Sequence, residues 1–500
     1  MGILQRVTRN FLALTASLIL ERGVSFVLFL IIARRLGADA LGEYALALSF
    51  LAIFETVSVF GQNLLVVREV VRDRDNAGRY LVNSSALVLI AAVLCGIIMP
   101  ASARVLGYPA QTVFYVGLAA LILIPDSLSA VPEAVLQAWE RMEFITLFRF
   151  VTNLLGAGLA IGLLLTGAGL AVVFYTLLAQ RILLTILYAV VVRQRLPGPL
   201  SLRPDLDFFR RLAQLSWTFL GMSVFSAVFK NVDMLILRGL ADAAEVGYYS
   251  AADRPVQLVG LMSPIVMTAV FPSLTATFRG DPERFAQLLE TTLRGLAAFT
   301  PLIAMLFTLA APAFVGVAYG AGYTAAVLPF QVLAWSLPPT FLAALLFRVL
   351  LASNHERVSL RVAFVNMIAS VILNLLLIPR WGAVGASVTT IFTALLGLAQ
   401  NYVYVQYRVV QLRASRALLR PALSIGAAAV LFIVLPDSWH IYLRGSVATL
   451  GYLVCIPALG VLSRSEMARI WAVVRGRPGH PVLPKTGEIR KAIRDPGSTQ

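Results

Sequence analysis

Long apolar stretches follow one another along almost the whole chain of 500 residues, which leaves little room for a water-soluble fold. Hydrophobic residues make up 59% of the chain and charged residues only 13%, whereas a soluble protein carries about 25% charged residues. One membrane crossing needs about 20 apolar residues. The sequence therefore predicts an all-α polytopic membrane protein with about fourteen transmembrane helices. The expected spans are 11–32, 41–65, 81–101, 111–136, 144–165, 170–192, 216–237, 250–274, 294–315, 327–351, 359–379, 384–405, 421–436 and 445–462.

The basic residues lie mostly on one side of the predicted membrane. If the N-terminus is cytoplasmic, the cytoplasmic segments hold 29 Lys and Arg and the outer loops hold 7. Cytoplasmic loops of membrane proteins carry such an excess of positive charge. We therefore expect both termini in the cytoplasm, and the net charge of +16 reflects membrane topology and not nucleic-acid binding.

An internal repeat indicates how the helices are grouped. After the first span the chain reads Arg35-Leu-Gly-Ala-Asp-Ala-Leu-Gly42-Glu-Tyr44, and after the seventh it reads Arg238-Gly-Leu-Ala-Asp-Ala-Ala-Glu-Val-Gly247-Tyr-Tyr249. The two copies are offset by about 205 residues and six spans, and repeated halves around a central site are typical of transporters. The predicted parts are two pseudo-symmetric six-helix bundles (1–192 and 216–405), a cytoplasmic linker (193–215), a C-terminal helix pair (421–462) and a partly disordered, basic cytoplasmic tail (463–500).

Four motifs that occur in order within residues 1–410 match a known family. They are Arg-x-Leu-Gly and Leu-Gly-x-Tyr within 34–44, Val232-Asp233, Val270-Phe-Pro-Ser-Leu274 and Ile378-Pro-Arg-Trp-Gly-Ala-Val-Gly-Ala386. In these motifs the chain resembles the multidrug/oligosaccharidyl-lipid/polysaccharide (MOP) exporter superfamily, and most closely its polysaccharide and O-antigen lipid flippases. The drug-extruding branch usually has twelve spans, so the two additional spans favour the lipid-linked oligosaccharide branch.

The resemblance implies a flippase that works by alternating access. Its substrate would be a polyprenyl-pyrophosphate-linked oligosaccharide, moved from the inner to the outer leaflet of the cell inner membrane for O-antigen or exopolysaccharide synthesis. It further implies contact with membrane lipids, cooperation with a polysaccharide polymerase or export machinery, and a monomeric state. No cofactor is expected, although H⁺ or Na⁺ could drive the transport.

Five cations lie inside the predicted spans, where lipid disfavours charge. A pyrophosphate crossing the membrane needs fixed cations, and the planar guanidinium of Arg binds phosphate oxygens with two parallel hydrogen bonds. The candidates for binding the pyrophosphate or glycan are Arg22, Arg149, Arg181, Lys230 and Arg348. The alternative is a structural role, either in ion pairs between helices or, for Arg149 and Arg348, in reaching the membrane interface.

Four acidic residues inside the spans are candidates for ion coupling. Glu21, Glu55, Asp126 and Asp233 could each bind a proton or Na⁺ as the cavity changes its exposure. Two structural alternatives stay open. Asp233 could pair with Lys230, which lies three residues earlier on the same helix face, and Asp126 could simply accompany the break that Pro125 makes in its helix.

Asp253 and Arg254 lie at the outer end of the eighth span. They could form a gating pair, or they could mark the start of a helix.

Two other functions compete with lipid flipping. A cation-coupled drug or metabolite exporter would share the fold, but its cavity would be rich in acidic and aromatic residues, whereas five cations inside the spans favour an anionic substrate. A glycan polymerase typically carries a large outer loop with catalytic Arg or His, and here the outer loops are short. The chain also lacks the ATP-binding, metalloprotease and serine-hydrolase motifs. We therefore expect a transporter and not an enzyme.

Overall fold

The described part of the chain is helical. The structure is a computed structural model, and it describes residues 3–196, 205–353, 355–412, 419–436, 439 and 441–461. These residues form α-helices and one short 3₁₀-helix, η1 (Ala321–Ala326), so the all-α prediction is confirmed. The predicted tail 463–500 and residues 197–204 of the predicted linker lie outside the described residues.

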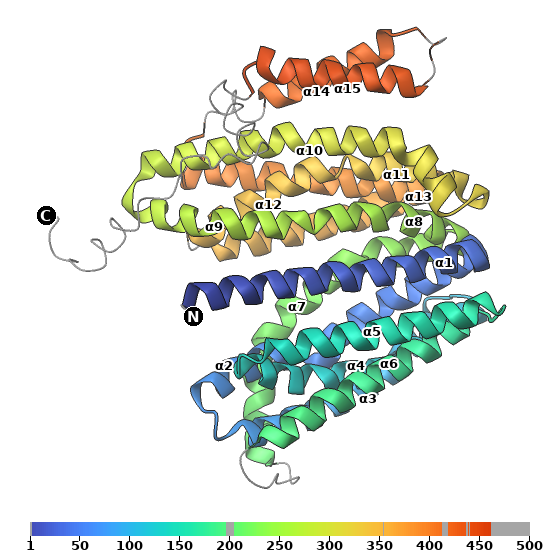
Figure 1. Ribbon diagram of the computed structural model, residues 1–500, viewed down its shortest axis with the longest axis vertical. Coiled ribbons are helices and arrows are strands. Elements are labelled where there is room, and N and C mark those ends of the chain that lie inside the picture. Colours follow the sequence, from blue (N-terminus) through green and yellow to red (C-terminus); the bar gives the residue numbers. More distant parts are fainter. Residues whose placement is uncertain are drawn as a thin grey trace, which may run out of the picture. The chain divides into compact units, whose positions relative to one another are not determined.

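The first predicted half contains six helices (Figure 1). They are α1 (Ile3–Val59), α2 (Gln62–Arg72), α3 (Ala77–Val105), α4 (Ala110–Ala138), α5 (Met142–Leu165) and α6 (Ala171–Arg195). A helix satisfies its backbone hydrogen bonds internally, which is what a segment in lipid requires. Helix α1 packs against α3, α4 and α5 of this half and also against α7 and α8 of the next.

The second predicted half and the C-terminal pair account for the other helices. They are α7 (Leu206–Leu240), α8 (Ala243–Gly260), α9 (Met262–Gly280), α10 (Pro282–Ala318), α11 (Val327–Ala334), α12 (Leu337–Ala352), α13 (Glu356–Arg408), α14 (Arg420–Val434) and α15 (Ile441–Ala458). Each of the fourteen predicted spans overlaps a helix. Among the described residues, nine helical stretches are long and apolar enough to cross a membrane, and the number of fourteen crossings stays a prediction.

Two glycines divide the longest helices at places where the sequence predicts a boundary between spans. Gly37 has φ 83° and ψ −177°, so α1 is two helices in series. Gly382 has φ 50° and ψ −128° and divides α13 in the same way. A residue with a Cβ is strained in these conformations, which glycine adopts readily. We call the end of the helices at which the Gly37 turn lies the Gly37 end, and the opposite end, where α6 ends at Arg195 and α7 begins at Leu206, the linker end.

The chain divides into two compact units that differ from the predicted halves. One unit combines Met1–Pro272 with Leu306–Val409, and the other combines Ser273–Met305 with Val410–Gln500. In the second unit, Tyr452 of α15 is fully buried, and its hydroxyl donates to the carbonyl of Ala298 in α10 at 3.0 Å. The first unit contains α1 to α8 and α11 to α13, and therefore all the candidate site residues.

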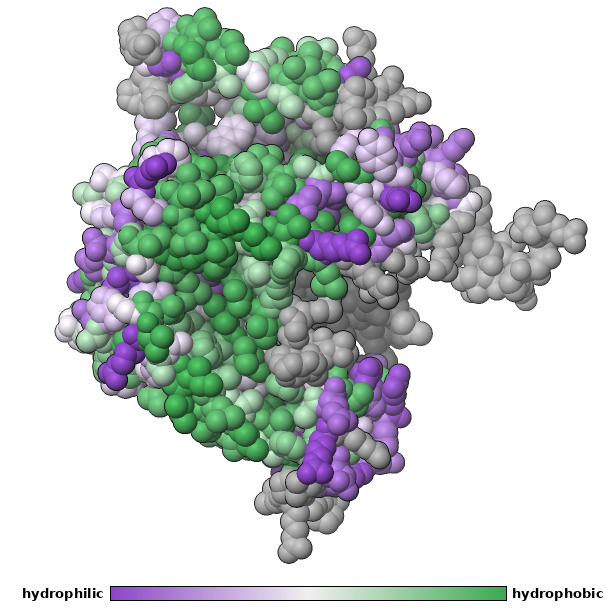
Figure 2. All heavy atoms as spheres, turned by 180° about the vertical axis from the view of Figure 1, so that it is seen from behind, coloured by the Kyte–Doolittle hydropathy of each residue, from purple (hydrophilic) through white to green (hydrophobic). Residues whose placement is uncertain are grey.

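Large apolar side chains lie on the surface of these helices. Ile97 of α3, Leu155 of α5 and Ile186 of α6 are each more than half exposed. Figure 2 shows many hydrophobic side chains side by side on the face that it draws. Exposed apolar patches of this extent are rare on soluble monomers, and they fit helices that face lipid. The protein is a multi-pass membrane protein.

Equivalent positions of the two repeats cross each other at the Gly37 end. A Cβ placed on Gly42 of α1 would overlap the carbonyl group of Ala243 in α8, and one placed on Gly247 would overlap the carbonyl group of Ala38. Ala38 and Ala243 are 205 positions apart, and so are Gly42 and Gly247, which is the offset of the sequence repeat. The two helices therefore meet with their backbones in contact, as small residues allow.

The beginning of α7 is held at the linker end. Asp205 caps this helix by accepting from the backbone N–H groups of Asp207 and Phe208, and its own N–H donates to Asn83 of α3 at 2.8 Å. The Arg79 side chain donates to the Asp205 carboxylate, and this hydrogen bond holds the pKa of Asp205 below its usual value. The first helix of the second predicted half is thus anchored on the first half.

The glycine crossing predicts a specific loss of stability. Gly42→Ala or Gly247→Ala would push a methyl group into the facing backbone, and such overpacking costs about 1–3 kcal/mol of unfolding free energy. Gly158→Ala in α5 is the matched control because nothing lies within 4 Å of the new methyl group. Thermal unfolding of the purified protein in detergent measures all three variants. A Gly42→Ala protein as stable as the Gly158→Ala protein would contradict the close crossing.

Candidate functional site

An ion pair joins α4 to α6 beside a proline in α4. Asp126 is buried, and its Oδ1 lies 3.0 Å from Nη1 of Arg181. Pro125 has no N–H to give to the helix, and its carbonyl accepts from the hydroxyl of Thr185 in α6 at 2.7 Å. The two helices therefore have two polar links at this level. The contact is one of the alternatives that the sequence left open for Arg181.

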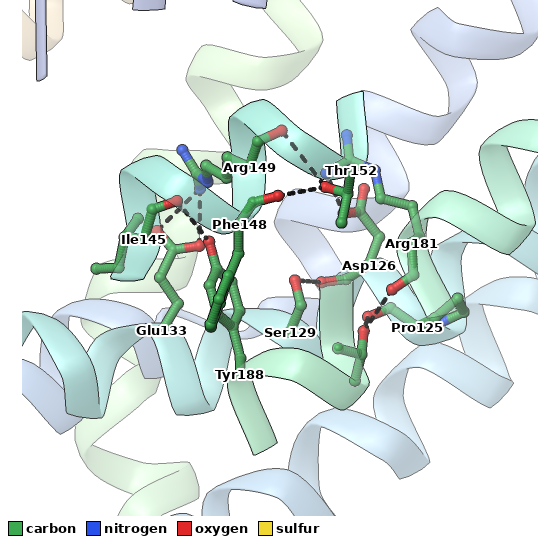
Figure 3. A network of polar contacts seen from close by, with 11 residues as sticks. Pro125, Asp126, Ser129, Glu133, Ile145, Phe148, Arg149, Thr152, Arg181 and Tyr188 are labelled. Carbon is green, nitrogen blue, oxygen red and sulfur yellow. Dashed lines mark hydrogen bonds and ion pairs between the residues drawn. The ribbon is translucent and has the colours of Figure 1, made fainter. Parts of the chain in front are cut away.

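A second ion pair lies nearer the linker end and joins α4 to α5. Nη2 of Arg149 lies 2.7 and 2.8 Å from the two carboxylate oxygens of Glu133, which is buried. Figure 3 shows both ion pairs, with Tyr188 of α6 beside Glu133 and Arg149. Glu133 was not among the predicted site residues. Its position seven residues after Asp126, on the same face of α4, is the signal that could have identified it.

Two further carboxyl groups lie near these pairs. Glu55, in the second part of α1, interacts electrostatically with both Asp126 and Arg181. Glu21, in the first part of α1, acts on Arg149 and Arg181. Neither glutamate forms an ion pair with any residue that the structure describes. We call the group of Glu21, Glu55, Asp126, Glu133, Arg149 and Arg181 the N-half cluster; it contains four carboxyl groups and two guanidinium groups.

Asp233 occupies a polar pocket in the second predicted half. Its carboxylate accepts from Asn374 at 2.6 Å, from Ser370 at 2.9 Å, from Tyr249 at 3.4 Å and from Thr390 at 3.5 Å. These partners come from α8 and from both parts of α13. Three of them, Ser370, Tyr249 and Thr390, line with Asp233 a cavity of about 310 Å³, which we call the Asp233 pocket. Its other polar lining residues include Lys230, Asp253, Gln257, Thr340, Asn366 and Asn401.

Lys230 does not pair with Asp233 in the described part of the chain. Its side chain is exposed, although both residues line the pocket. The i, i+3 ion pair that the sequence left open is therefore replaced by hydrogen bonds from neighbouring helices. Arg22 of α1 is likewise exposed, and no ion pair to it occurs among the described residues. Arg348 is partly buried, with its guanidinium 5.8 Å from the ring centre of Phe271.

Asp253 and Arg254, the predicted gating pair, face different neighbours. Asp253 lines the Asp233 pocket and accepts from Gln257. Arg254 lies over the ring of Phe29 in α1, with 5.3 Å between its guanidinium carbon and the ring centre. The structure describes no ion pair between the two residues.

An ion pair at the Gly37 end was also missed from the sequence. Glu43 of α1 and Arg238 of α7 approach to 3.1 Å, and Thr112 of α4 bonds to both. In the sequence Arg238 follows the apolar run of its span and therefore counts among the seven cations of the outer loops. Glu43, a charge directly after Gly42 in the repeat motif, is the signal that the sequence offers for this pair.

Comparisons with known proteins place the chain within a family and a fold. A family model described as "Polysaccharide biosynthesis protein" matches residues 7–278. A relative from Haloferax volcanii, "Probable low-salt glycan biosynthesis flippase Agl15", is 25% identical over 403 residues, which are 77% of this chain and 80% of the relative.

Solved transporter structures share the fold. The structure titled "Lipid II flippase MurJ, inward closed conformation" has a TM-score of 0.69 at 14% identity and covers 93% of this chain and 99% of its own. An inward-facing multidrug resistance MATE family transporter of the MOP superfamily has a TM-score of 0.61 at 13% identity, with coverages of 78% and 94%. These matches confirm the all-α, polytopic fold expected from the sequence, and the division into two six-helix bundles stays a prediction.

The Glu133–Arg149 pair predicts a measurable contribution to stability. Glu133→Gln leaves the partly buried guanidinium of Arg149 without its counter-charge, which should lower the unfolding free energy by about 1–3 kcal/mol. Glu143→Gln is the control because Glu143 forms an exposed ion pair with Arg141, and such pairs contribute at most about 1 kcal/mol. Equal thermal unfolding of the two variants would contradict a stabilising role for Glu133.

Proposed function

The chain belongs to the polysaccharide biosynthesis protein family, and we propose that it is a flippase for a polyprenyl-pyrophosphate-linked oligosaccharide. It moves this lipid from the inner to the outer leaflet by alternating access, with the sugar and pyrophosphate in a polar interior and the lipid tail in the bilayer. Both the family and the flippase named among its relatives support this function.

The observation that carries the proposal is the uneven exposure of the N-half ion pairs. The side chains of Arg149 and Arg181 are 40% and 33% exposed, whereas those of their partners Glu133 and Asp126 are only 11% and 6% exposed. A guanidinium facing lipid would be strongly disfavoured, so these edges face water-accessible space within the protein. They offer fixed N–H donors to an anion, while the carboxylates behind them hold the side chains in place.

The other predicted cations extend this binding surface. Arg22 and Lys230 are exposed, and Arg348 and Arg254 are partly buried. Tyr44 of α1 is close enough to interact electrostatically with both Arg181 and Arg254. In the proposed complex Arg181 binds the pyrophosphate, and Arg22, Arg149, Lys230 and Arg348 contact the pyrophosphate or the glycan.

Ion coupling follows from the charge balance of the N-half cluster. The cluster sets four carboxyl groups against two guanidinium groups, and a carboxyl group within a membrane span can bind H⁺ or Na⁺ as its exposure changes. Protonation of Asp126 or Glu133 would also free the adjacent guanidinium for the pyrophosphate. Proton binding and substrate binding are then linked, and each strengthens the other. Glu55 and Glu21 supply the additional carboxyl groups of this coupling site.

The Asp233 pocket is proposed as a second coupling site. It brings one carboxylate together with the hydroxyls of Ser370, Tyr249 and Thr390. Hard cations bind such sets of oxygen atoms, so the pocket suits Na⁺ as well as H⁺.

The finer parts of the proposal concern location and partners. We place the protein in the cell inner membrane with both termini in the cytoplasm, as the distribution of Lys and Arg predicts. It acts as a monomer and delivers its substrate to a polysaccharide polymerase or export machinery. Asp253 and Arg254 remain proposed gating residues within α8.

Flipping in proteoliposomes tests the proposed binding site. With an undecaprenyl-pyrophosphate-linked glycan, Arg181→Ala should reduce flipping at least about tenfold, because a charge-assisted hydrogen bond contributes about 1.5–3 kcal/mol. Asp126→Asn should bind the substrate at least as tightly as wild type but lose pH dependence, because it imitates the protonated carboxyl. Arg141→Ala, which alters an exposed pair at the linker end, should keep full activity.

Two outcomes would contradict the proposal. If Arg181→Ala flips the glycan-lipid as fast as Arg141→Ala does, Arg181 has only a structural role. If wild type moves no glycan-lipid under either a pH or a Na⁺ gradient, the exporter of drugs or metabolites becomes the better explanation of this fold.

The Asp233 pocket makes a separate prediction. Asp233→Asn keeps the size of the side chain but removes its charge, so an imposed Na⁺ gradient should no longer accelerate flipping, while the slow rate without a gradient persists. Asp207→Asn, at an exposed position in the first turn of the same helix, is the control. A gradient response that survives Asp233→Asn would leave the coupling to the N-half cluster alone.

A further inference from the structure

The two repeats hold each other at the Gly37 end through matching contacts. The Tyr108 hydroxyl, after α3, donates to the carbonyl of Leu235 in α7 at 2.9 Å. The Tyr323 hydroxyl, after α10, donates to the carbonyl of Ala33 in α1 at 3.3 Å. In each case a tyrosine that follows the third span of one half binds the end of the first helix of the other half. Together with the glycine crossing, these contacts join the two predicted halves at the Gly37 end of α1 and α7, and we call this set of contacts the ring.

A buried ion pair lies within this ring. Nη2 of Arg238 in α7 lies 3.1 Å from Oε1 of Glu43 in α1 and 3.0 Å from the hydroxyl of Thr112 in α4. The Thr112 hydroxyl donates to the same Oε1 at 2.8 Å. The two charged side chains are only 10% and 6% exposed. Among the described residues, this is the one buried ion pair that links the two predicted halves.

The Glu43–Arg238 pair is not the arrangement that would stabilise the contact between the two halves most. Oε2 of Glu43 and Nε of Arg238 are buried without hydrogen bonds to any described atom. A buried ion pair with unsatisfied atoms retains much of its desolvation penalty, and well-packed apolar residues would hold the same surfaces together at least as well. If the ring opens, water reaches both charges and removes that penalty. The pair therefore specifies how the two halves meet and still permits them to separate.

We propose that Glu43, Thr112 and Arg238 form the lock of the gate that closes the Gly37 end of the transporter. The lock is made when this end is shut and is broken when the substrate leaves. In the predicted orientation this is the outer face of the membrane. The inference rests on the alternating-access part of the proposed function and does not depend on which lipid-linked glycan is carried.

A cysteine behind the lock tests this inference. Ser49 of α1 is buried, and its hydroxyl lies 3.1 Å from the sulfur of Met234 in α7, so it sits between the same two helices. It is six residues beyond Glu43, about 9 Å deeper at 1.5 Å per residue. The reporter is Ser49→Cys with both native cysteines replaced (Cys95→Ser and Cys455→Ser). Its rate of reaction with a membrane-impermeant maleimide is measured with the reagent on each side of sealed vesicles.

The expected result is a large change in accessibility from one side only. Glu43→Gln and Arg238→Gln should each raise the outer-side labelling rate of the Ser49→Cys reporter about tenfold, which corresponds to about 1.4 kcal/mol. Thr112→Val keeps both charges and should give a smaller increase. Glu69→Gln is the matched control because it removes an ion pair with Arg68 on the linker-end helix α2, and it should leave labelling at the parental rate.

The outcomes separate this inference from the proposed function. If Glu43→Gln folds and labels at the parental rate, the lock is excluded, and Thr112→Val decides the same question should the charge variants not fold. If the faster labelling comes from the cytoplasmic side, the assignment of the gate to the outer face is wrong. If labelling rises as expected but wild type flips no glycan-lipid, the gate is supported and the proposed substrate is wrong.

Discussion

A charge inside an apolar helix bundle needs an opposite charge or several polar partners close to it, and this need positions the functional groups of the protein. Arg181 forms an ion pair with Asp126, and Arg238 forms one with Glu43. The Asp233 carboxylate instead accepts hydrogen bonds from four side chains. In each case the partners come from different helices, so each of these three charges also fixes a contact between helices. Movements of the helices must then change the surroundings of these charges, which is how binding and transport can be linked.

Much of the fold could be predicted because length, hydropathy and glycine position determine it locally. The turns at Gly37 and Gly382 lie where the apolar runs are interrupted, and only glycine suits their backbone angles. Breaks inside an apolar run could not be predicted. The expected span 41–65 is divided at Phe60 and Gly61, and Phe60 has φ 55°. A hydropathy profile does not reveal such a break, because the break depends on how the Phe60 side chain packs against neighbouring helices.

Many charged residues of the candidate site could be identified in the sequence, but the sequence did not show which of them contact one another. Asp126, Arg181 and Asp233 stand out as charges within apolar runs. Glu133, the partner of Arg149, and Arg238, the partner of Glu43, did not stand out, because they lie near the ends of such runs, where charges are common. Spacing along one helix was also a poor guide. Lys230 and Asp233 share a helix face, yet Asp233 bonds to other helices, since only the tertiary fold decides which groups come within hydrogen-bonding distance.

The proposed gate and the proposed coupling site are carried by one rigid element. The second part of α1 runs without a break from the turn at Gly37 to Val59. Glu43 lies near its beginning, in the lock, and Glu55 lies near its other end, in the N-half cluster. The two are twelve residues apart, about 18 Å along a helix. A tilt of this segment about Gly37 that separates Glu43 from Arg238 therefore also moves Glu55 relative to Asp126 and Arg181. A change of charge in the cluster can bias the same tilt, because the helix transmits displacement in both directions.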